Sequence, residues 1–196
     1  MLKFFWEIKK MNKKNRETEI KFKINRVEEI IQNLKKIGCK FEGKAFEKTI
    51  RFDTPSDELE KEGKFLRLRS GFKNVLTYKS KIENKQFKER EEIEIEVLHP
   101  EKIKLILEKL GFTKIKIMEK YRQKWSGGNV EIVIDKLPFG FFLEIEGKRS
   151  DITKTVSKLG LKMKNSSTKT YWDLWKEFSR KEGIKDENIV FNLNKN

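Results

Sequence analysis

The sequence predicts an α+β fold, with eight antiparallel strands closed into a β-barrel and amphipathic helices packed outside it. Three observations support this prediction. Strand-like stretches alternate apolar and charged residues, which gives each strand one charged face. A strand–helix–strands pattern occurs twice, so that Gly38 aligns with Gly111 and Ile20 with Ile93, each 73 positions later. Only about four amphipathic helices are available; if they cover the outside of a closed sheet, the charged faces point inward.

The first repeat begins with a strand in RETEIKFKI, from Arg16 to Ile24. Val27, Ile30 and Leu34 then recur at helical spacing, and Gly38 ends the predicted helix. Period-two alternation predicts the next strands at 42–53, 64–70 and 74–82.

The second repeat begins with a strand near Lys88, followed by a helix that Pro100 opens and Gly111 closes. Ile103, Ile106, Leu107 and Leu110 are expected on one apolar face of this helix. Alternating stretches and turn residues predict the later strands and helices, namely strands at 114–125, 129–136 and 141–148 and helices at 151–160 and 168–180.

The chain of 196 residues suits one domain with tails, and we expect a basic extension at 1–15, a domain at 16–180 and a tail at 181–196. The sequence contains no run of about 18 apolar residues that could span a membrane, so no membrane partner is expected. A single cysteine, Cys39, excludes an intrachain disulfide and fits a reducing, cytoplasmic compartment.

The formal net charge of +15 indicates attraction to polyanions, although a lysine-rich composition alone could produce it. The arrangement of the charges is more informative. In the first strand Glu17, Glu19, Lys21 and Lys23 share one face. Inside a barrel such charges need partners, and a polyphosphate with a divalent cation would satisfy both signs. A non-catalytic binder of polyphosphate or RNA stays open as an alternative.

The same residues carry a resemblance to a known family. ETEIK resembles the Glu-x-Glu-x-Lys signature of the CYTH superfamily, the triphosphate tunnel metalloenzymes. The similarity covers about residues 16 to 178 through an ordered series of motifs: RFDTPSDELEKEGKFLRLRS, LTYKS, KEREEIEIEV, EKYRQKW, VIDKLPFGFFLEIEG and STKTYWDL. It implies an eight-stranded tunnel and an enzyme, either a triphosphatase or a class IV adenylate cyclase, acting on tripolyphosphate, a nucleoside triphosphate or thiamine triphosphate.

The resemblance also implies site residues. The metal-binding acids, for Mg²⁺ or Mn²⁺, would be Glu17, Glu19, Asp135, Glu144 and Glu146. The triphosphate-binding bases would be Lys21, Arg67, Arg69, Lys79, Lys120, Arg122 and Lys169. Glu92 or Glu94 would orient the nucleophile, and Lys21 would join them in catalysis.

The motifs do not choose between hydrolysis and cyclisation, because both reactions need the same phosphate clamp. Ser80 is followed by Lys81 where cyclase-like members often carry Gly-Pro, so the departure bears on the substrate more than on the fold. We favour hydrolysis, which needs no nucleoside specificity. No specific nucleic-acid partner is expected, and a homodimer is left open.

Overall fold

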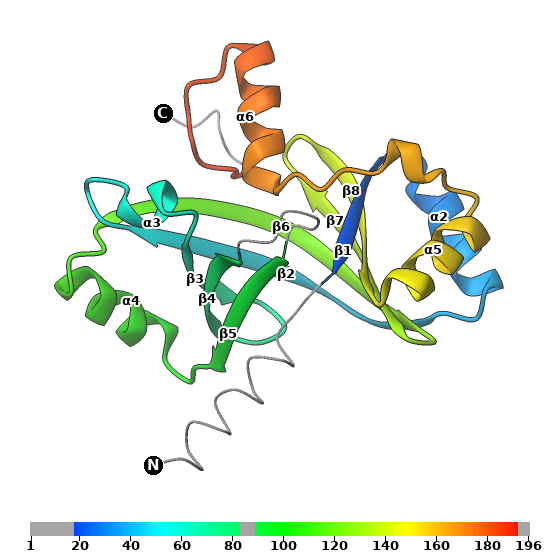
Figure 1. Cartoon of the computed structure of the whole chain (residues 1–196), viewed down its shortest axis with the longest axis horizontal. Helices are drawn as coiled ribbons and strands as arrows, with labels where there is room; N and C mark the ends of the chain where they lie inside the picture. Colours follow the sequence, from blue (N-terminus) through cyan, green and yellow to red (C-terminus); the bar gives the residue numbers. More distant parts are fainter. Residues whose placement is uncertain (1–17, 83–88, 192–196) are drawn as a thin grey trace. The chain divides into compact units, whose positions relative to one another are not determined.

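The computed structural model describes residues 18–82 and 89–191, and these residues form one eight-stranded sheet with helices (Figure 1). Its strand order is β1-β8-β7-β6-β2-β3-β4-β5. The strands are β1 (Glu19–Ile24), β2 (Lys40–Asp53), β3 (Phe65–Ser70), β4 (Val75–Ile82), β5 (Glu89–Glu96), β6 (Lys114–Gly127), β7 (Val130–Leu137) and β8 (Gly140–Gly147). The helices are α2 (Val27–Lys36), α3 (Glu58–Lys61), α4 (Pro100–Lys109), α5 (Arg149–Lys158), η1 (Met163–Asn165) and α6 (Tyr171–Glu182).

The α+β class and the antiparallel eight-stranded sheet are confirmed. Among the described residues, hydrogen bonds leave β1 and β5 at the two ends of the strand order, so they do not close the sheet into a barrel. The described chain divides into two compact units, a first unit of residues 49–116 and a second unit of residues 18–48 and 117–191. The long strands β2 and β6 contribute residues to both units.

The core of the second unit lies between one face of β1, β8 and β7 and the two helices α2 and α5, which lie side by side in Figure 1. Alternate strand residues such as Phe22, Leu143 and Ile132 are buried there. Leu34 of α2 and Ile152 of α5 pack against them. The alternating residues between these buried ones carry the charged side chains, and they therefore face away from the helices.

The core of the first unit is smaller and centres on Phe52, Leu68 and Leu107, the last from α4. Only part of the predicted apolar face of α4 is covered. Leu107 is buried, whereas Ile106 is 53% exposed and Leu110 is 68% exposed. The apolar stripe of this helix is thus wider than the sheet face that the described residues place against it.

The helix ends follow the predicted glycine signals. Gly38 and Gly111 follow α2 and α4 with φ of +80° and +94°, a left-handed conformation that glycine adopts without steric cost. No helix in the described part of the chain combines the length and the apolar character that crossing a membrane requires.

The predicted domain limits stay predictions, but part of the expected tail is packed. Ile189 is fully buried, and its backbone pairs with β6 through hydrogen bonds of Glu119 N to Ile189 O (2.7 Å) and Ile189 N to Ile117 O (2.8 Å). Trp175 of α6 donates its indole N–H to the carbonyl of Asp186 at 3.0 Å. Residues 183–191 therefore belong to the second unit.

Candidate functional site

The charged face of the second unit is assembled by strand register. Glu19 lies opposite Glu146 and Lys21 opposite Glu144 where β1 pairs with β8. Glu146 in turn lies opposite Glu131 on β7. Directly opposed residues of antiparallel strands point to the same side of the sheet with their Cβ atoms about 5 Å apart. A row of three carboxylates and an adjacent base therefore share one face.

Asp135 of β7 is the centre of a buried cluster on this face. Its carboxylate accepts four hydrogen bonds, two from Arg122 (2.7 and 2.6 Å), one from Lys120 (3.1 Å) and one from the hydroxyl of Tyr171 (2.9 Å). Asp135 is fully buried, which alone would raise the pKa of its carboxyl. The charges of Arg122 and Lys120 outweigh burial and hold the pKa of Asp135 well below its ordinary value, so the group is ionised.

Glu144 of β8 links the two bases of the cluster. Lys21 approaches one of its oxygens at 2.7 Å, and Arg122 donates to the other at 2.8 Å. Burial opposes charge on both Lys21 and Glu144, but the neighbouring opposite charges together outweigh it, namely Glu144 and Glu19 for Lys21 and Lys21 and Arg122 for Glu144. The pKa of Lys21 is therefore raised and that of Glu144 lowered. For Lys120, by contrast, burial and the nearby charge of Arg122 lower the pKa.

The segment leading into α6 holds Lys21 from its other side. The backbone of Lys21 exchanges hydrogen bonds of 3.1 and 2.8 Å with Ser167, and its ammonium lies 3.4 Å from the carbonyl oxygen of Lys169. The same ammonium lies 4.5 Å from the ring centroid of Tyr171. Burial and the charge of Asp135 raise the pKa of the Tyr171 hydroxyl well above its ordinary value, so it acts as a donor. The sequence analysis placed Tyr171 only within the helix expected at 168–180.

Glu47 of β2 also lies in this cluster, although the sequence reasoning did not select it. Its side chain is 4% exposed, and one oxygen lies 3.4 Å from the Lys120 ammonium and 3.6 Å from Arg122 Nε. Glu47 has the same strand parity as Thr49, Arg51 and other buried polar residues of β2, and that alternation was the signal that could have identified it.

The first unit contains a charged group of its own on β3, β4 and β5. Lys79 lies 2.5 Å from Glu92, while Arg67 lies 3.5 Å from Glu92 and 3.6 Å from Glu94. The hydroxyl of fully buried Thr77 donates to Glu94 at 2.7 Å. Burial would raise the pKa of Glu94, but this hydrogen bond and the neighbouring arginines lower it.

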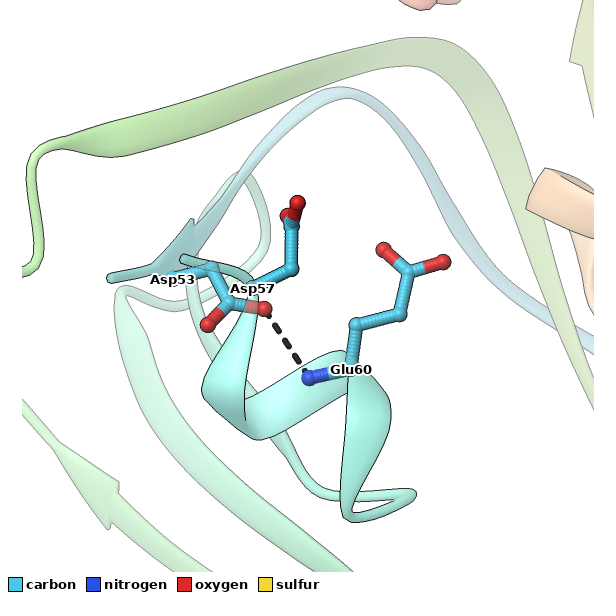
Figure 2. A group of neighbouring side chains, drawn as sticks. All are labelled: Asp53, Asp57 and Glu60. Atoms are coloured by element: carbon cyan, nitrogen blue, oxygen red, sulfur yellow. Dashed lines mark hydrogen bonds between the residues drawn. The ribbon is translucent and has the colours of Figure 1, made fainter. Parts of the chain in front are cut away.

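Three further acids of the first unit lie close together near α3, and Figure 2 shows Asp53, Asp57 and Glu60. Asp53 accepts backbone N–H bonds from Thr54 (2.8 Å), Leu59 (2.9 Å) and Glu60 (3.0 Å), the last drawn as a dashed line. It therefore organises the turn into α3.

The other two acids of this trio are paired with bases. Lys114 donates to Asp57 at 2.6 Å, while Arg51 and Lys116 lie 3.3 and 3.4 Å from Glu60. These contacts account for the trio as a turn and ion-pair network.

The structure brings many of the predicted site residues together within each unit. In the second unit the buried cluster contains Lys21, Lys120, Arg122, Asp135 and Glu144. In the first unit Arg67, Lys79, Glu92 and Glu94 lie in one group, and Arg69 shares their strand face.

Three predicted residues stand differently. Glu19 is exposed and lies 3.8 Å from Lys21. Lys169 accepts a contact from the Lys21 ammonium at its carbonyl oxygen, while its own ammonium pairs with Glu177, and its role at the phosphates stays a prediction. Glu17 lies outside the described residues.

Comparison with known families agrees with this arrangement. The CYTH domain family matches residues 15–171, which include every strand and both charged groups. The chain belongs to the CYTH family. A CYTH relative from Methanocaldococcus jannaschii, whose name reads "putative adenylate cyclase", is 36% identical over 140 residues, which is 70% of this chain and 80% of that protein.

Solved structures match the CYTH chain over most of its length. A Pyrococcus horikoshii protein is 29% identical with a TM-score of 0.67, covering 79% of this chain and 96% of its own. A Hippeastrum protein described as a putative adenylyl cyclase with a dominant triphosphatase activity is 17% identical, with a TM-score of 0.58 and coverage of 83% and 96%. The latter likeness concerns the fold alone.

The donor set of this CYTH chain fits a hard divalent cation. Carboxylate oxygens are the ligands that Mg²⁺ and Mn²⁺ prefer. Strand register places Glu19 and Glu146 opposite each other on one sheet face, whereas Glu131, the next acid of the row, pairs with Lys124 at 2.8 Å. Like charges placed directly opposite destabilise a sheet, and a bound cation would relieve that repulsion. Asp135 is less available as a metal ligand than the acids of this row, because its oxygens already accept four hydrogen bonds.

Proposed function

We propose that this CYTH protein is a divalent-metal-dependent triphosphatase that hydrolyses the terminal phosphoanhydride of a small triphosphate. The observation that carries the proposal is the group of Lys21, Lys120 and Arg122, whose side chains are 4%, 6% and 12% exposed and are held in place by Asp135 and Glu144. Burying three bases is costly unless an anion or fixed carboxylates compensate them. A triphosphate is an anion of sufficient charge to replace some of these carboxylate contacts.

In the proposed reaction these bases bind the non-bridging phosphate oxygens. Arg122 presents a planar fork that suits two oxygens, and Lys21 provides a compact charge. Water attacks the terminal phosphorus, the bond to the bridging oxygen breaks, and the bases stabilise the charge that develops on the leaving group. From the family resemblance, Glu92 or Glu94 would orient the water and accept its proton.

Mg²⁺ or Mn²⁺ would supply charge neutralisation and orientation of the phosphates when bound. Glu19 and Glu146 are the proposed ligands, with Glu144 and Asp135 as the further acids named from the family resemblance. Among these, the exposed Glu19 is the most readily available, because it is not tied by the dense hydrogen bonding that surrounds Asp135.

The closed eight-stranded barrel with its tunnel is part of the same proposal. It is supported by the eight antiparallel strands and by the separation of apolar and charged strand faces within each unit. Paired cysteines introduced on β1 and β5 and oxidised in solution would test closure, because only adjacent strands bring two Cα atoms within about 7 Å.

A second candidate is an adenylate cyclase that converts ATP to cyclic AMP and pyrophosphate. The Methanocaldococcus jannaschii relative favours it, since a protein 36% identical bears that name. Here a ribose hydroxyl would attack the α-phosphorus, with the same bases holding the phosphates.

We propose a cytoplasmic location for either enzyme. The partner would be a small triphosphate, and a homodimer is left open.

The deciding experiment incubates the purified full-length protein with tripolyphosphate, ATP or thiamine triphosphate, each with Mg²⁺ or Mn²⁺. Release of orthophosphate supports the triphosphatase, while cyclic AMP with pyrophosphate supports the cyclase. No turnover of any of the three by a folded protein would overturn both enzyme proposals.

A non-catalytic polyanion binder would behave differently from an enzyme. It would bind polyphosphate or RNA with strong salt dependence. Its binding would survive the replacement of Glu19 by Gln, since that acid would have no role in a simple basic surface. Salt-sensitive binding without any turnover would therefore favour the binder.

A further inference from the structure

We propose that Glu47 keeps the buried bases of the second unit electrically balanced, so that a triphosphate binds them tightly only together with a divalent cation. The inference rests on the proposed function and adds a residue and a coupling to it. Glu47 is buried on β2, and neither the strand motifs nor the family resemblance singled it out.

Glu47 is held differently from the other acids of the cluster. Asp135 accepts four hydrogen bonds, and both oxygens of Glu144 contact bases at 2.7 and 2.8 Å. The Oε2 atom of Glu47 is buried and accepts no hydrogen bond within the described residues, although Lys120 and Arg122 lie 3.4 and 3.6 Å away. Glu47 thus acts on the bases through its charge more than through hydrogen bonding.

The charges of this cluster balance. The bases are the buried Lys21 and Lys120 and the 12%-exposed Arg122, and the acids that contact them are the buried Glu47 and Asp135 and the 12%-exposed Glu144. An incoming triphosphate meets three carboxylates at close range, and juxtaposing like charges in a desolvated site opposes binding. A divalent cation that enters with the phosphates offsets this repulsion.

Removing one of these carboxyl charges should therefore uncouple the anion from the metal. Glu47 suits this test, because Asp135 and Glu144 are tied to the bases by short hydrogen bonds whose loss would displace them. Glu47→Gln keeps the shape of the side chain and removes its charge. Glu47→Asp keeps the charge with a shorter stem. Glu42→Gln, at an exposed position of the same strand, is the matched control.

The experiment measures binding by titration calorimetry with a triphosphate analogue whose bridging oxygens are replaced by NH groups, so that no turnover occurs. Each protein is titrated in EDTA and in excess Mg²⁺, after circular dichroism confirms folding. We expect Glu47→Gln to bind the analogue on the order of tenfold more tightly than wild type in EDTA, with a change under about threefold in Mg²⁺. Glu47→Asp and Glu42→Gln should retain the wild-type dependence on metal.

The outcomes separate this inference from the proposed function. If wild type fails to bind the analogue even in Mg²⁺, both are overturned. If wild type binds the analogue in Mg²⁺, but Glu47→Gln and wild type bind it with equal affinity in EDTA, only the role of Glu47 is overturned. Weaker binding by Glu47→Gln under both conditions would assign Glu47 to positioning the bases and would also overturn the coupling.

Discussion

The Tyr171 hydroxyl donates a hydrogen bond of 2.9 Å to Asp135, which ties the first turn of α6 to strand β7. The Tyr171 ring also packs against Phe142, with centroids 5.3 Å apart, and lies under the Lys21 ammonium. One side chain therefore supports an acid and a base of the buried cluster at once. The two contributions can be separated, because one belongs to the hydroxyl and the other to the ring.

Replacing Tyr171 by Phe should remove the hydroxyl contribution alone. A hydrogen bond to a charged group contributes about 1.5–3 kcal/mol, so we expect the free energy of unfolding to fall by roughly that amount. The ring contacts should persist and keep the fold. Urea denaturation followed by circular dichroism measures the change. Tyr121→Phe, at a partly exposed position, should change stability by less than about 0.5 kcal/mol; equal losses for both variants would contradict the assignment.

The hydrogen bond between Tyr171 and Asp135 could not be predicted from the sequence. Alternation predicted which faces of the strands are charged, because strand geometry fixes side-chain direction two residues at a time. It could not separate Tyr171 from the other aromatic residues of its helix, since helical spacing does not reveal which hydroxyl meets a buried carboxylate. Glu47 was missed although its alternation with Thr49 and Arg51 was visible, because its importance depends on β2 lying beside β6.

Two further differences between the sequence predictions and the structure, at α3 and α4, have local causes. The helix α3 has only four residues, too few for a periodic pattern, and hydrogen bonds to the Asp53 carboxylate organise it. The apolar stripe of α4 predicted burial of Ile106 and Leu110, but periodicity reports only that residues share a face and not how much of that face is covered.

Asp135→Asn should destabilise the protein at neutral pH. Breaking a buried ion pair by removing one partner costs about 3–5 kcal/mol, because Arg122 and Lys120 lose their compensating charge. The pKa of Asp135 is lowered in the folded state, so its charged form contributes stability that is fully present above its ordinary pKa of about 3.9. That contribution is lost as the pH falls through the lowered folded value.

The stability gap between wild type and Asp135→Asn should therefore narrow below about pH 4. Urea unfolding at pH 7 and pH 3 measures the gap, and Glu182→Gln, at an exposed position of α6, controls for a general loss of carboxyl charge. A gap that stays constant between these pH values would show that Asp135 contributes by packing and not by charge.

Glu19→Gln should raise the metal requirement of the proposed triphosphatase. Glu19 is exposed, so the substitution should leave the fold intact while removing one carboxylate from the row opposite Glu146. We expect the Mg²⁺ concentration for half-maximal phosphate release to rise tenfold or more. Glu29→Gln, on the exposed side of α2, is the control. An unchanged Mg²⁺ dependence would remove Glu19 from the metal site.

Glu94→Gln tests the charged group of the first unit. The Thr77 hydroxyl donates to Glu94, and the lowered pKa of this carboxyl keeps it ionised, so that it can accept a hydrogen bond from the nucleophile and orient it. If Glu94 orients the attacking water, the substitution should lower kcat by about 10²–10⁴-fold. KM should change by less than about threefold, because the phosphate-binding bases are untouched.

Glu96→Gln is the matched control for that substitution, since Glu96 follows two residues later on the same face of β5 and is exposed beside Lys73. It should leave both kinetic constants near their wild-type values. A rise in KM with unchanged kcat in Glu94→Gln would mean that Glu94 acts by holding Arg67, 3.6 Å away, in place for the substrate. The nucleophile-orienting role would then fall to Glu92, whose contacts with Lys79 and Arg67 place it in the same group.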